Sequence, residues 1–205
     1  MSMPSERPII EWASAGAPLE GPESGDLHVV APFPNGVLVA VIDGLGHGPG
    51  AAEAARVAAS ILRAEAALPV RDLIERCHEG LRPTRGAVMS LASLDARSST
   101  VEWCGVGNVE GVLLRATATS AKASEAIGTR GGVVGFRLPP LHVSTVPISP
   151  RDVLVMVTDG IRGGFTDSLD LEREPQALVD TVFARYAKGS DDSLVLAARY
   201  LGRAP

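Results

Sequence analysis

The sequence predicts an α+β fold in which two mostly antiparallel sheets stack on each other and helices cover the outside. Two strand-like segments are followed by two helical segments, then by a run of strands, one helix and a last strand. Regular alternation would indicate a parallel α/β sheet, whereas such runs indicate α+β with antiparallel pairing. Several strands are apolar on both faces, which favours burial between layers.

The length and composition are those of one globular domain. A chain of 205 residues can bury a full-sized core, and a second domain would be cramped. Hydrophobic residues make up 45% and charged residues 21%, close to the globular norm. We therefore expect residues 1–205 to form a single domain.

The first half combines strands with two helices. Pro34-Asn35 marks a turn between two strands, and the second strand is a continuous apolar run that ends in a carboxylate. An Ala-rich helix, favoured by alanine's high helix propensity, follows a glycine-rich loop at Gly44–Gly50 and is stopped by Pro69. The expected elements are an edge strand at 9–12, strands at 27–33 and 36–43, a helix from about 51 to about 67, and an amphipathic helix at 70–81.

From residue 86 onward the pattern changes to strands separated by short turns rich in Gly, Ser, Asp and Pro. The expected elements are strands at 87–95, 100–107, 111–117, 142–148 and 152–158, a helix at 175–187 and a strand at 193–200.

Charge and hydropathy exclude several classes of partner. A net charge of −5 and scattered basic residues argue against nucleic acid. The longest purely apolar run, residues 37–42, is far shorter than a membrane span, and no signal peptide precedes it. The two cysteines form no disulfide framework or zinc motif. We expect a cytoplasmic protein without nucleic-acid or membrane partners.

Acidic residues lie at the ends of several strands, beside turn residues. Asp26 opens the strand at 27–33, and Asp43 closes the next one. Asp159 closes the strand at 152–158, and Asp191-Asp192 precede the last strand. One such Asp is usually just a turn residue, but Asp43 and Asp159 both end long buried strands that must be neighbours in a compact core.

Carboxylates that meet in this way need a cation. Two of them at 4 Å repel by about 4 kcal/mol at an effective dielectric near 20, so either their pKa values rise or a cation neutralises them. Oxygen ligands suit Mg²⁺ or Mn²⁺ rather than zinc. Two divalent ions would balance four carboxylates, and a hydroxide bridging them is suited to in-line attack on a phosphate ester.

The order of the motifs is similar to that of a known enzyme family. They are Ser24-Gly25-Asp26, Asp43-Gly44-Leu45-Gly46-His47-Gly48, Gly105-Val106-Gly107-Asn108, Gly131–Gly135, Asp152–Gly160 and Asp191-Asp192-Ser193. The set resembles the metal-dependent type 2C (PPM) protein phosphatases, most closely their short bacterial branch of sporulation and stress-response serine phosphatases, which includes a stressosome phosphatase. The resemblance spans residues 24–196.

The resemblance implies an αββα sandwich with two Mn²⁺ or Mg²⁺ ions in the cleft between the sheets. By matched motif, Asp43 would bridge both ions, and Asp26 with the Gly44 carbonyl would hold the second ion. Asp159 and Asp191 would hold the first ion, because the first acidic residue of the final motif is the family's ligand. The implied reaction is dephosphorylation of Ser or Thr on a partner protein, such as a stressosome scaffold protein, by the metal-bridging hydroxide.

Two further residues are candidates for the same reaction. His47 follows Asp43 by four residues and could donate a proton to the leaving seryl oxygen; alternatively it caps the Ala-rich helix. Larger relatives carry a phosphate-binding Arg just before the first metal Asp, whereas the nearest upstream Arg here is Arg7. Arg162 could grip the phosphate by bidentate hydrogen bonds or be an exposed loop residue.

Two other functions stay open at this point. A nucleotide-binding protein could use the Gly44–Gly50 loop, since Gly46-x-Gly48-x-x-Ala51 loosely fits the dinucleotide fingerprint. That motif requires a parallel second strand ending in an acidic residue. The third reading is a phosphatase-like binding module that has lost catalysis, although all four metal Asp positions are filled.

Overall fold

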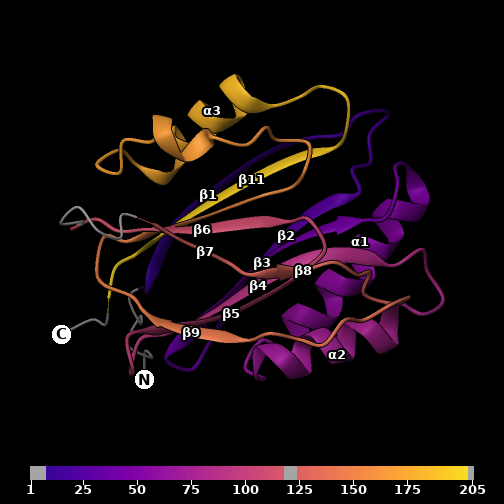
Figure 1. Ribbon diagram of the computed structural model, residues 1–205, viewed down its shortest axis with the longest axis horizontal. Helices are drawn as coiled ribbons and strands as arrows, with labels where there is room; N and C mark the ends of the chain where they lie inside the picture. Colours follow the sequence, from indigo (N-terminus) through magenta and orange to yellow (C-terminus); the bar gives the residue numbers. More distant parts are fainter. Residues whose placement is uncertain (1–7, 118–123, 203–205) are drawn as a thin grey trace, which may run out of the picture.

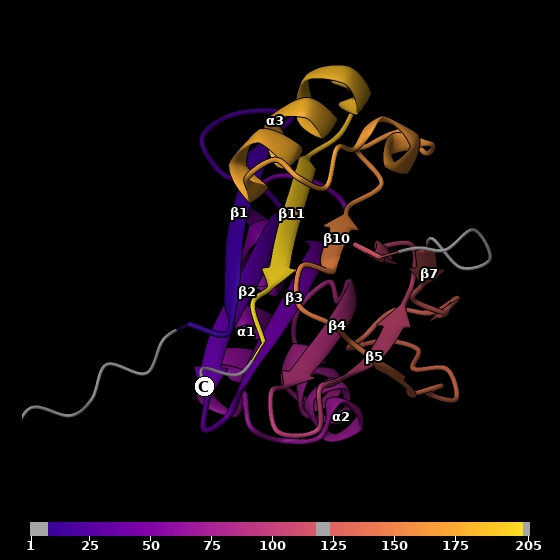
Figure 2. The ribbon, with the colours of Figure 1, turned by 90° about the vertical axis from the view of Figure 1, so that its left-hand side faces the viewer.

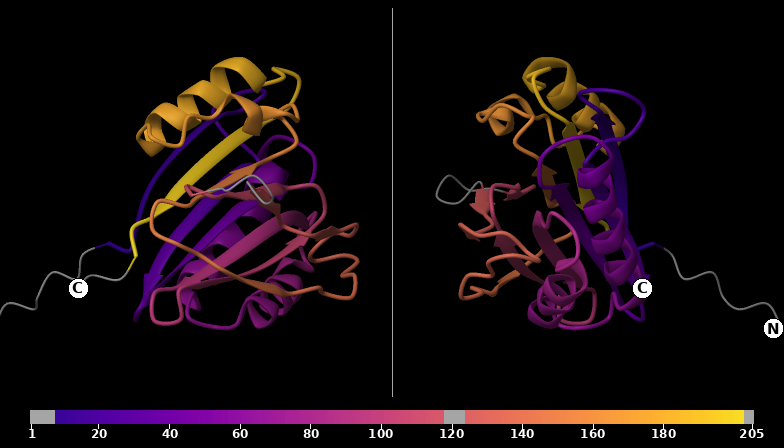
Figure 3. Two further views of the ribbon diagram at one scale, coloured as in Figure 1. Left: turned by 60° about the vertical axis from the view of Figure 1, so that its left-hand side comes forward. Right: turned by 90° about the vertical axis from the view of Figure 1, so that its right-hand side faces the viewer.

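The protein is an αββα sandwich, seen in a computed structural model that describes residues 8–117 and 124–202. Two sheets face each other, with helices on the two outer faces (Figure 1). Helices α1 and α2 cover one sheet and α3 covers the other, which is clear when the molecule is turned (Figure 3). The α+β sandwich predicted from the order of elements is confirmed.

The first sheet has the strand order β1-β11-β10-β6-β7 and is antiparallel throughout. The interior strand β11 pairs along the whole of the edge strand β1, from Ile10↔Tyr200 to Ala17↔Ser193. Its strands are β1 (Ile10–Ala17), β6 (Glu110–Leu114), β7 (Ser124–Ala126), β10 (Val153–Val157) and β11 (Ser193–Tyr200).

The second sheet has the order β2-β3-β4-β5-β8, and β9 also pairs with β5. Figure 2 shows strands β2 to β5 of this sheet. All its pairs are antiparallel except the short β5–β8 pair. Its strands are β2 (Asp26–Phe33), β3 (Gly36–Gly44), β4 (Ala87–Asp95), β5 (Thr100–Val106), β8 (Thr129–Arg130) and β9 (Ser144–Pro147).

Three α-helices and one 3₁₀ turn complete the described residues: α1 (Pro49–Ala64), α2 (Val70–Leu81), η1 (Phe165–Ser168) and α3 (Pro175–Tyr186). Proline occupies the first turn of α1 and of α3, where its missing N–H costs no helical hydrogen bond. The buried face of α1 is mostly alanine, so the helix packs closely on the second sheet. No helix of the described residues is both long and apolar enough to cross a membrane.

Three apolar layers hold the sandwich together. The middle layer lies between the sheets and contains Val39, Leu113 and Leu196. One outer layer joins α1 and α2 to the second sheet, and the other joins α3 to the first. Because β3, β10 and β11 are covered on both faces, nearly all their residues are buried, which explains their continuous apolar runs.

The structure differs from the sequence expectations at several boundaries. β1 continues to Ala17 instead of ending at residue 12, because β11 pairs with it over that whole length. β6 stops at Leu114, since the next residues turn toward Asp152, whose carboxylate accepts hydrogen bonds from Arg115 and from the Ala116 N–H at 3.0 Å. The short strands β7 and β8 have no counterpart among the predicted elements.

Candidate metal centre

The acidic residues identified in the sequence gather at one end of the sandwich. Asp26 and Asp43 are register partners on β2 and β3. Asp159 follows β10, and Asp191-Asp192 precede the antiparallel neighbour β11. Two hydrogen bonds join the sheets at this end: Thr158 Oγ1 donates to Asp26 at 2.6 Å, and the Gly25 N–H donates to Asp192 at 2.6 Å.

Asp26 is buried in a strongly acidic environment. Its side chain is 5% exposed. Burial, reinforced by Asp192, Asp159 and Asp191, raises the pKa of Asp26 to about 7, although the hydrogen bond from Thr158 opposes the shift. The carboxylate is thus held where its charge is unfavourable without a cation.

Asp43 shows the same effect more strongly. Burial raises the pKa of Asp43 to about 8, and the charges of Asp26, Asp159, Asp191 and Asp192 add to the shift. Yet no three His, Cys, Asp or Glu side chains of residues 8–117 and 124–202 form a group that could hold a metal ion. The carboxylates are therefore close enough to shift one another's pKa values, but they do not form a closed set of metal ligands.

Polar neighbours orient Asp159, and these contacts do not follow from the sequence pattern. Asn108 Nδ2 donates to Asp159 Oδ2 at 2.8 Å, and the exposed Lys188 donates from Nζ to the Asp159 carbonyl. Asn108 belongs to the Gly105–Asn108 motif, but its partner lies 51 residues away, so only the fold shows its contact. Thr158, directly before Asp159, binds Asp26 instead and also accepts the Leu194 N–H at 2.9 Å.

The adjacent acidic residues Asp191 and Asp192 differ in their surroundings. Asp192 is buried, and its two carboxylate oxygens accept the N–H groups of Leu19 and Gly25, both at 2.6 Å. Asp191 is exposed, and within the described part of the chain its carboxylate accepts one hydrogen bond, from the Asp192 N–H at 2.9 Å. The carboxylate of Asp191 is thus the freer of the two to bind a ligand.

Two glycines permit the close backbone contacts on which the centre depends. A Cβ on Gly44 would lie 2.1 Å from the carbonyl oxygen of Ala51 in α1. A Cβ on Gly160 would lie 2.0 Å from the carbonyl oxygen of Asp192. Real Cβ atoms do not approach so closely, so each Asp-Gly pair needs its glycine for packing and not only for a turn.

Gly44→Ala should lower the free energy of unfolding by about 3 kcal/mol, the upper end of the usual cost of overpacking, because the atom it meets is backbone. The measurement is urea denaturation without metal. Gly163→Ala is the matched control, since nothing lies within 4 Å of a Cβ there, and it should change stability little. Equal stability of the two variants would contradict the prediction, because it would show that the backbone at residue 44 can move away from α1 without cost.

His47 lies in the exposed loop between Asp43 and α1. The alternative that it caps the helix is wrong: the N-cap residue is Gly48, and none of the side chains that the structure describes caps this end. The His47 carbonyl accepts Arg85 Nη1 at 3.5 Å, and Arg85 also lies against Gly46 and Gly50. The proton-donor role of His47 stays a prediction.

Arg162 is exposed, and its hydrogen bonds are with the end of α3. Its Nη2 donates to the Arg185 carbonyl at 3.0 Å, and its N–H donates to the Tyr186 carbonyl at 2.8 Å, both at the C-terminal end of α3. A role in phosphate binding stays a prediction, and it would require this side chain to release α3. Arg85 and Lys188 are basic residues beside the motif loops that the sequence analysis did not single out.

The nucleotide-binding alternative lacks its structural context. A dinucleotide fingerprint requires a helix that connects two parallel strands. Here β3 is followed by α1, α2 and then β4, which pairs antiparallel to β3. The glycine-rich loop is therefore not part of a βαβ unit.

Comparison with known proteins agrees with this architecture. A model of the family described as Stage II sporulation protein E (SpoIIE) matches residues 34–201. In sequence, the phosphoserine phosphatase RsbX of Bacillus subtilis (strain 168) is 32% identical over 77 residues, which cover 38% of this chain and 39% of RsbX. The matched segment is thus well under half of either protein.

Solved structures are similar over nearly the whole chain. The structure of RsbX in complex with magnesium has a TM-score of 0.84 at 21% identity and covers 96% of this chain and 98% of that one. A structure of the bacterial stressosome, described as a modular system adapted to control secondary messenger signaling, has a TM-score of 0.82 at 28% identity and covers 93% and 99%. Since the family match spans most of the sequence and the fold is shared, the chain belongs to the SpoIIE family of PP2C-type phosphatases.

Proposed function

We propose that the chain is a metal-dependent protein phosphatase that removes phosphate from Ser or Thr of a partner protein. The observation that carries the proposal is the convergence of strand-end carboxylates from both sheets, where burial and mutual repulsion raise the pKa of Asp26 to about 7 and the pKa of Asp43 to about 8. Membership of a phosphatase family supports the interpretation of this acidic cluster as a site for phosphate ester hydrolysis.

The chemistry of the candidate ligands suits two divalent ions, Mn²⁺ or Mg²⁺, although the carboxylates of the described residues do not form a closed group in this structure. All candidate ligands are oxygen atoms, which suit these hard cations. Asp43 would bridge the ions, Asp26 and the Gly44 carbonyl would hold one, and Asp159 and Asp191 the other. Bound ions supply a nucleophilic hydroxide at neutral pH and neutralise phosphate charge. In RsbX, a structural relative, magnesium is present.

The chain's own residues would orient this chemistry. Thr158 and Asn108 fix the carboxylates of Asp26 and Asp159 through the hydrogen bonds described above. His47, exposed at the mouth of the centre, would donate a proton to the leaving seryl oxygen. Hydrogen-bond partners such as Thr158 and Asn108 fix the direction of the carboxylate lone pairs, and this orientation tunes the affinity for metal.

The proposed substrate is a phosphoprotein, and the best candidates are Ser- and Thr-phosphorylated scaffold proteins of a stressosome in the cytoplasm. The proposal draws on the sequence match to RsbX and on the structural match to a stressosome component. A phosphatase-like module without catalysis is the competing possibility, and metal-dependent turnover separates the two.

We expect kcat/KM for a phosphoprotein to exceed that for free phosphoserine by at least about a hundredfold, since contacts remote from the reacting group contribute to transition-state binding. The measurement is phosphate release from both substrates by the purified chain in Mn²⁺. Equal efficiency toward the two would contradict a protein substrate and point to a small phosphate ester.

A further inference from the structure

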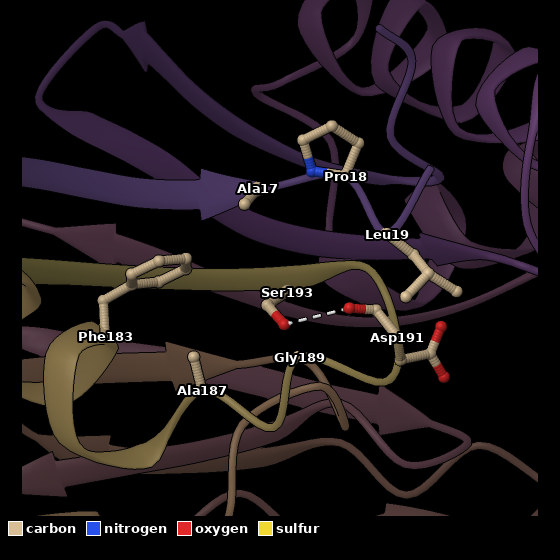
Figure 4. Close-up of a pocket in the computed structure, with 8 residues that line it drawn as sticks. All are labelled: Ala17, Pro18, Leu19, Phe183, Ala187, Gly189, Asp191 and Ser193. Atoms are coloured by element: carbon tan, nitrogen blue, oxygen red, sulfur yellow. Dashed lines mark hydrogen bonds between the residues drawn. The ribbon is translucent and has the colours of Figure 1, made fainter. Parts of the chain in front are cut away.

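A small cavity opens beside the metal centre, between the end of β1, the C-terminal end of α3 and the segment that leads into β11 (Figure 4). Its volume is about 200 Å³. The residues that line it are Ala17, Pro18, Leu19, Phe183, Ala187, Gly189, Asp191 and Ser193.

The wall of this cavity is mainly apolar. Pro18, Leu19 and Phe183 supply its larger side chains (Figure 4). The Ser193 hydroxyl donates to the carbonyls of Asp191 and Gly160, at 3.2 and 3.3 Å, and is therefore already engaged. The cavity thus suits an apolar group rather than a charged one.

Two adjacent residues, Asp191 and Asp192, link the lining of the cavity to the acidic cluster. Asp191, a candidate metal ligand, is part of its lining. The Asp192 carboxylate bridges the two sites. One oxygen accepts the N–H of Leu19, which lines the cavity, and the other accepts the N–H of Gly25, which precedes Asp26, each at 2.6 Å. A group seated in the cavity therefore lies next to Asp191.

The size of the cavity indicates the kind of ligand. Pockets for drug-sized molecules and cofactors measure roughly 300–1,000 Å³, whereas this one is about 200 Å³. It is suited to a single side chain. An extended peptide that places its phosphorylated residue at the metal centre would bring a neighbouring side chain to the cavity.

We propose that this cavity is a specificity subsite that receives one apolar side chain of the substrate, close in sequence to the phosphorylated Ser or Thr. The inference rests on the proposed phosphatase function and deepens it. Its occupant is a segment of the phosphoprotein, recognised by burial of its apolar side chain between Leu19 and Phe183.

The test uses short Gly/Ser phosphopeptides in which one Leu is moved through three positions on each side of phosphoserine, with Gln as the polar comparison of similar size. We expect Leu at one position to raise kcat/KM about tenfold over Gln, in keeping with burial of an aliphatic side chain. In Ala17→Phe, which fills the cavity, and in Phe183→Ala, which removes a wall, this ratio should fall to about one.

Two control variants add or remove one aromatic side chain outside the cavity. Arg97→Phe adds an aromatic residue in the turn after β4, at the end of the second sheet opposite Asp43. Trp12→Ala removes an exposed aromatic side chain from β1 that does not line the cavity. Both should keep the wild-type ratio, and thermal melting checks the fold of all four variants.

The outcomes separate the subsite from the proposed function. Metal-dependent hydrolysis of p-nitrophenyl phosphate without a Leu preference at any position would overturn the subsite and leave the phosphatase function standing. A preference that survives in folded Ala17→Phe and Phe183→Ala would also overturn it. Altered self-association of Ala17→Phe without altered peptide preference would assign the cavity to a second copy of the chain. Absence of any metal-dependent hydrolysis would refute the proposed function, and the subsite with it.

Discussion

Asp43→Asn should abolish phosphatase activity while the protein stays folded. Asp43 lies where β2 begins and β3 ends, and it is the residue proposed to bridge both ions. Loss of a partner that merely orients a ligand costs roughly 10–100-fold, so loss of the shared ligand should lower kcat by more than about a hundredfold. The measurement is phosphate release at saturating Mn²⁺.

The fold of this variant should not suffer, because the substitution removes a charge from a repelling group. Burial and four neighbouring carboxylates raise the pKa of Asp43 to about 8, which means that the ionised form is disfavoured in the metal-free protein. Asp167→Asn is the control, since Asp167 is exposed in η1, and it should keep full activity. Wild-type activity in Asp43→Asn would exclude the bridging role.

The second large effect is on stability in the absence of metal. The pKa values of Asp26 and Asp43 rise from an ordinary 3.8 to about 7 and about 8 in the folded protein. Between the ordinary pKa of 3.8 and the raised values of about 7 and about 8, the native state binds more protons than the unfolded state. The free energy of unfolding therefore falls as pH rises through this range. We therefore expect metal-free protein to be less stable at pH 8 than at pH 5.

Metal should reverse this loss. A ligand at about 100 times its Kd stabilises the native state by about 2.7 kcal/mol, which corresponds to a rise in Tm of roughly 5–10 °C for a chain of this size. The measurement is thermal unfolding at pH 8 with and without Mn²⁺ or Mg²⁺, repeated for Asp43→Asn, which should show a smaller shift. A metal-free Tm that increases from pH 5 to pH 8 would contradict the electrostatic account of the centre.

Much of the fold is predictable because burial leaves a clear pattern in the sequence. The helix at 70–81 and the strands at 87–95 and 193–200 have the predicted bounds, since the helix is strongly amphipathic and the strands are covered on both faces. By contrast, β7 and β8 have only three and two residues, and none of them is buried. Such strands exist through pairing with β6 and β5, so they carry no apolar periodicity of their own.

The candidate centre is predictable as a set of strand-end carboxylates, but its supporting contacts are not. The proximity of Asp43 and Asp159 follows from the need of long apolar strands to share a core. The hydrogen bond from Asn108 to Asp159 spans 51 residues, and that from Thr158 to Asp26 spans 132. No local pattern encodes them. Likewise, Arg162 is close to Asp159 in sequence, yet its guanidinium contacts the end of α3, because the loop after Gly160 pairs with the residues at the C-terminal end of that helix.

The proposed function depends most directly on metal-dependent turnover of a phosphorylated protein. The measurement is the initial rate of phosphate release from a Ser-phosphorylated protein by metal-stripped chain, as Mn²⁺ or Mg²⁺ is added and then removed with excess chelator. The account predicts no turnover without metal, a saturable increase as metal is added, and return to the baseline in chelator. Full activity in excess chelator, or none at saturating metal, would contradict it.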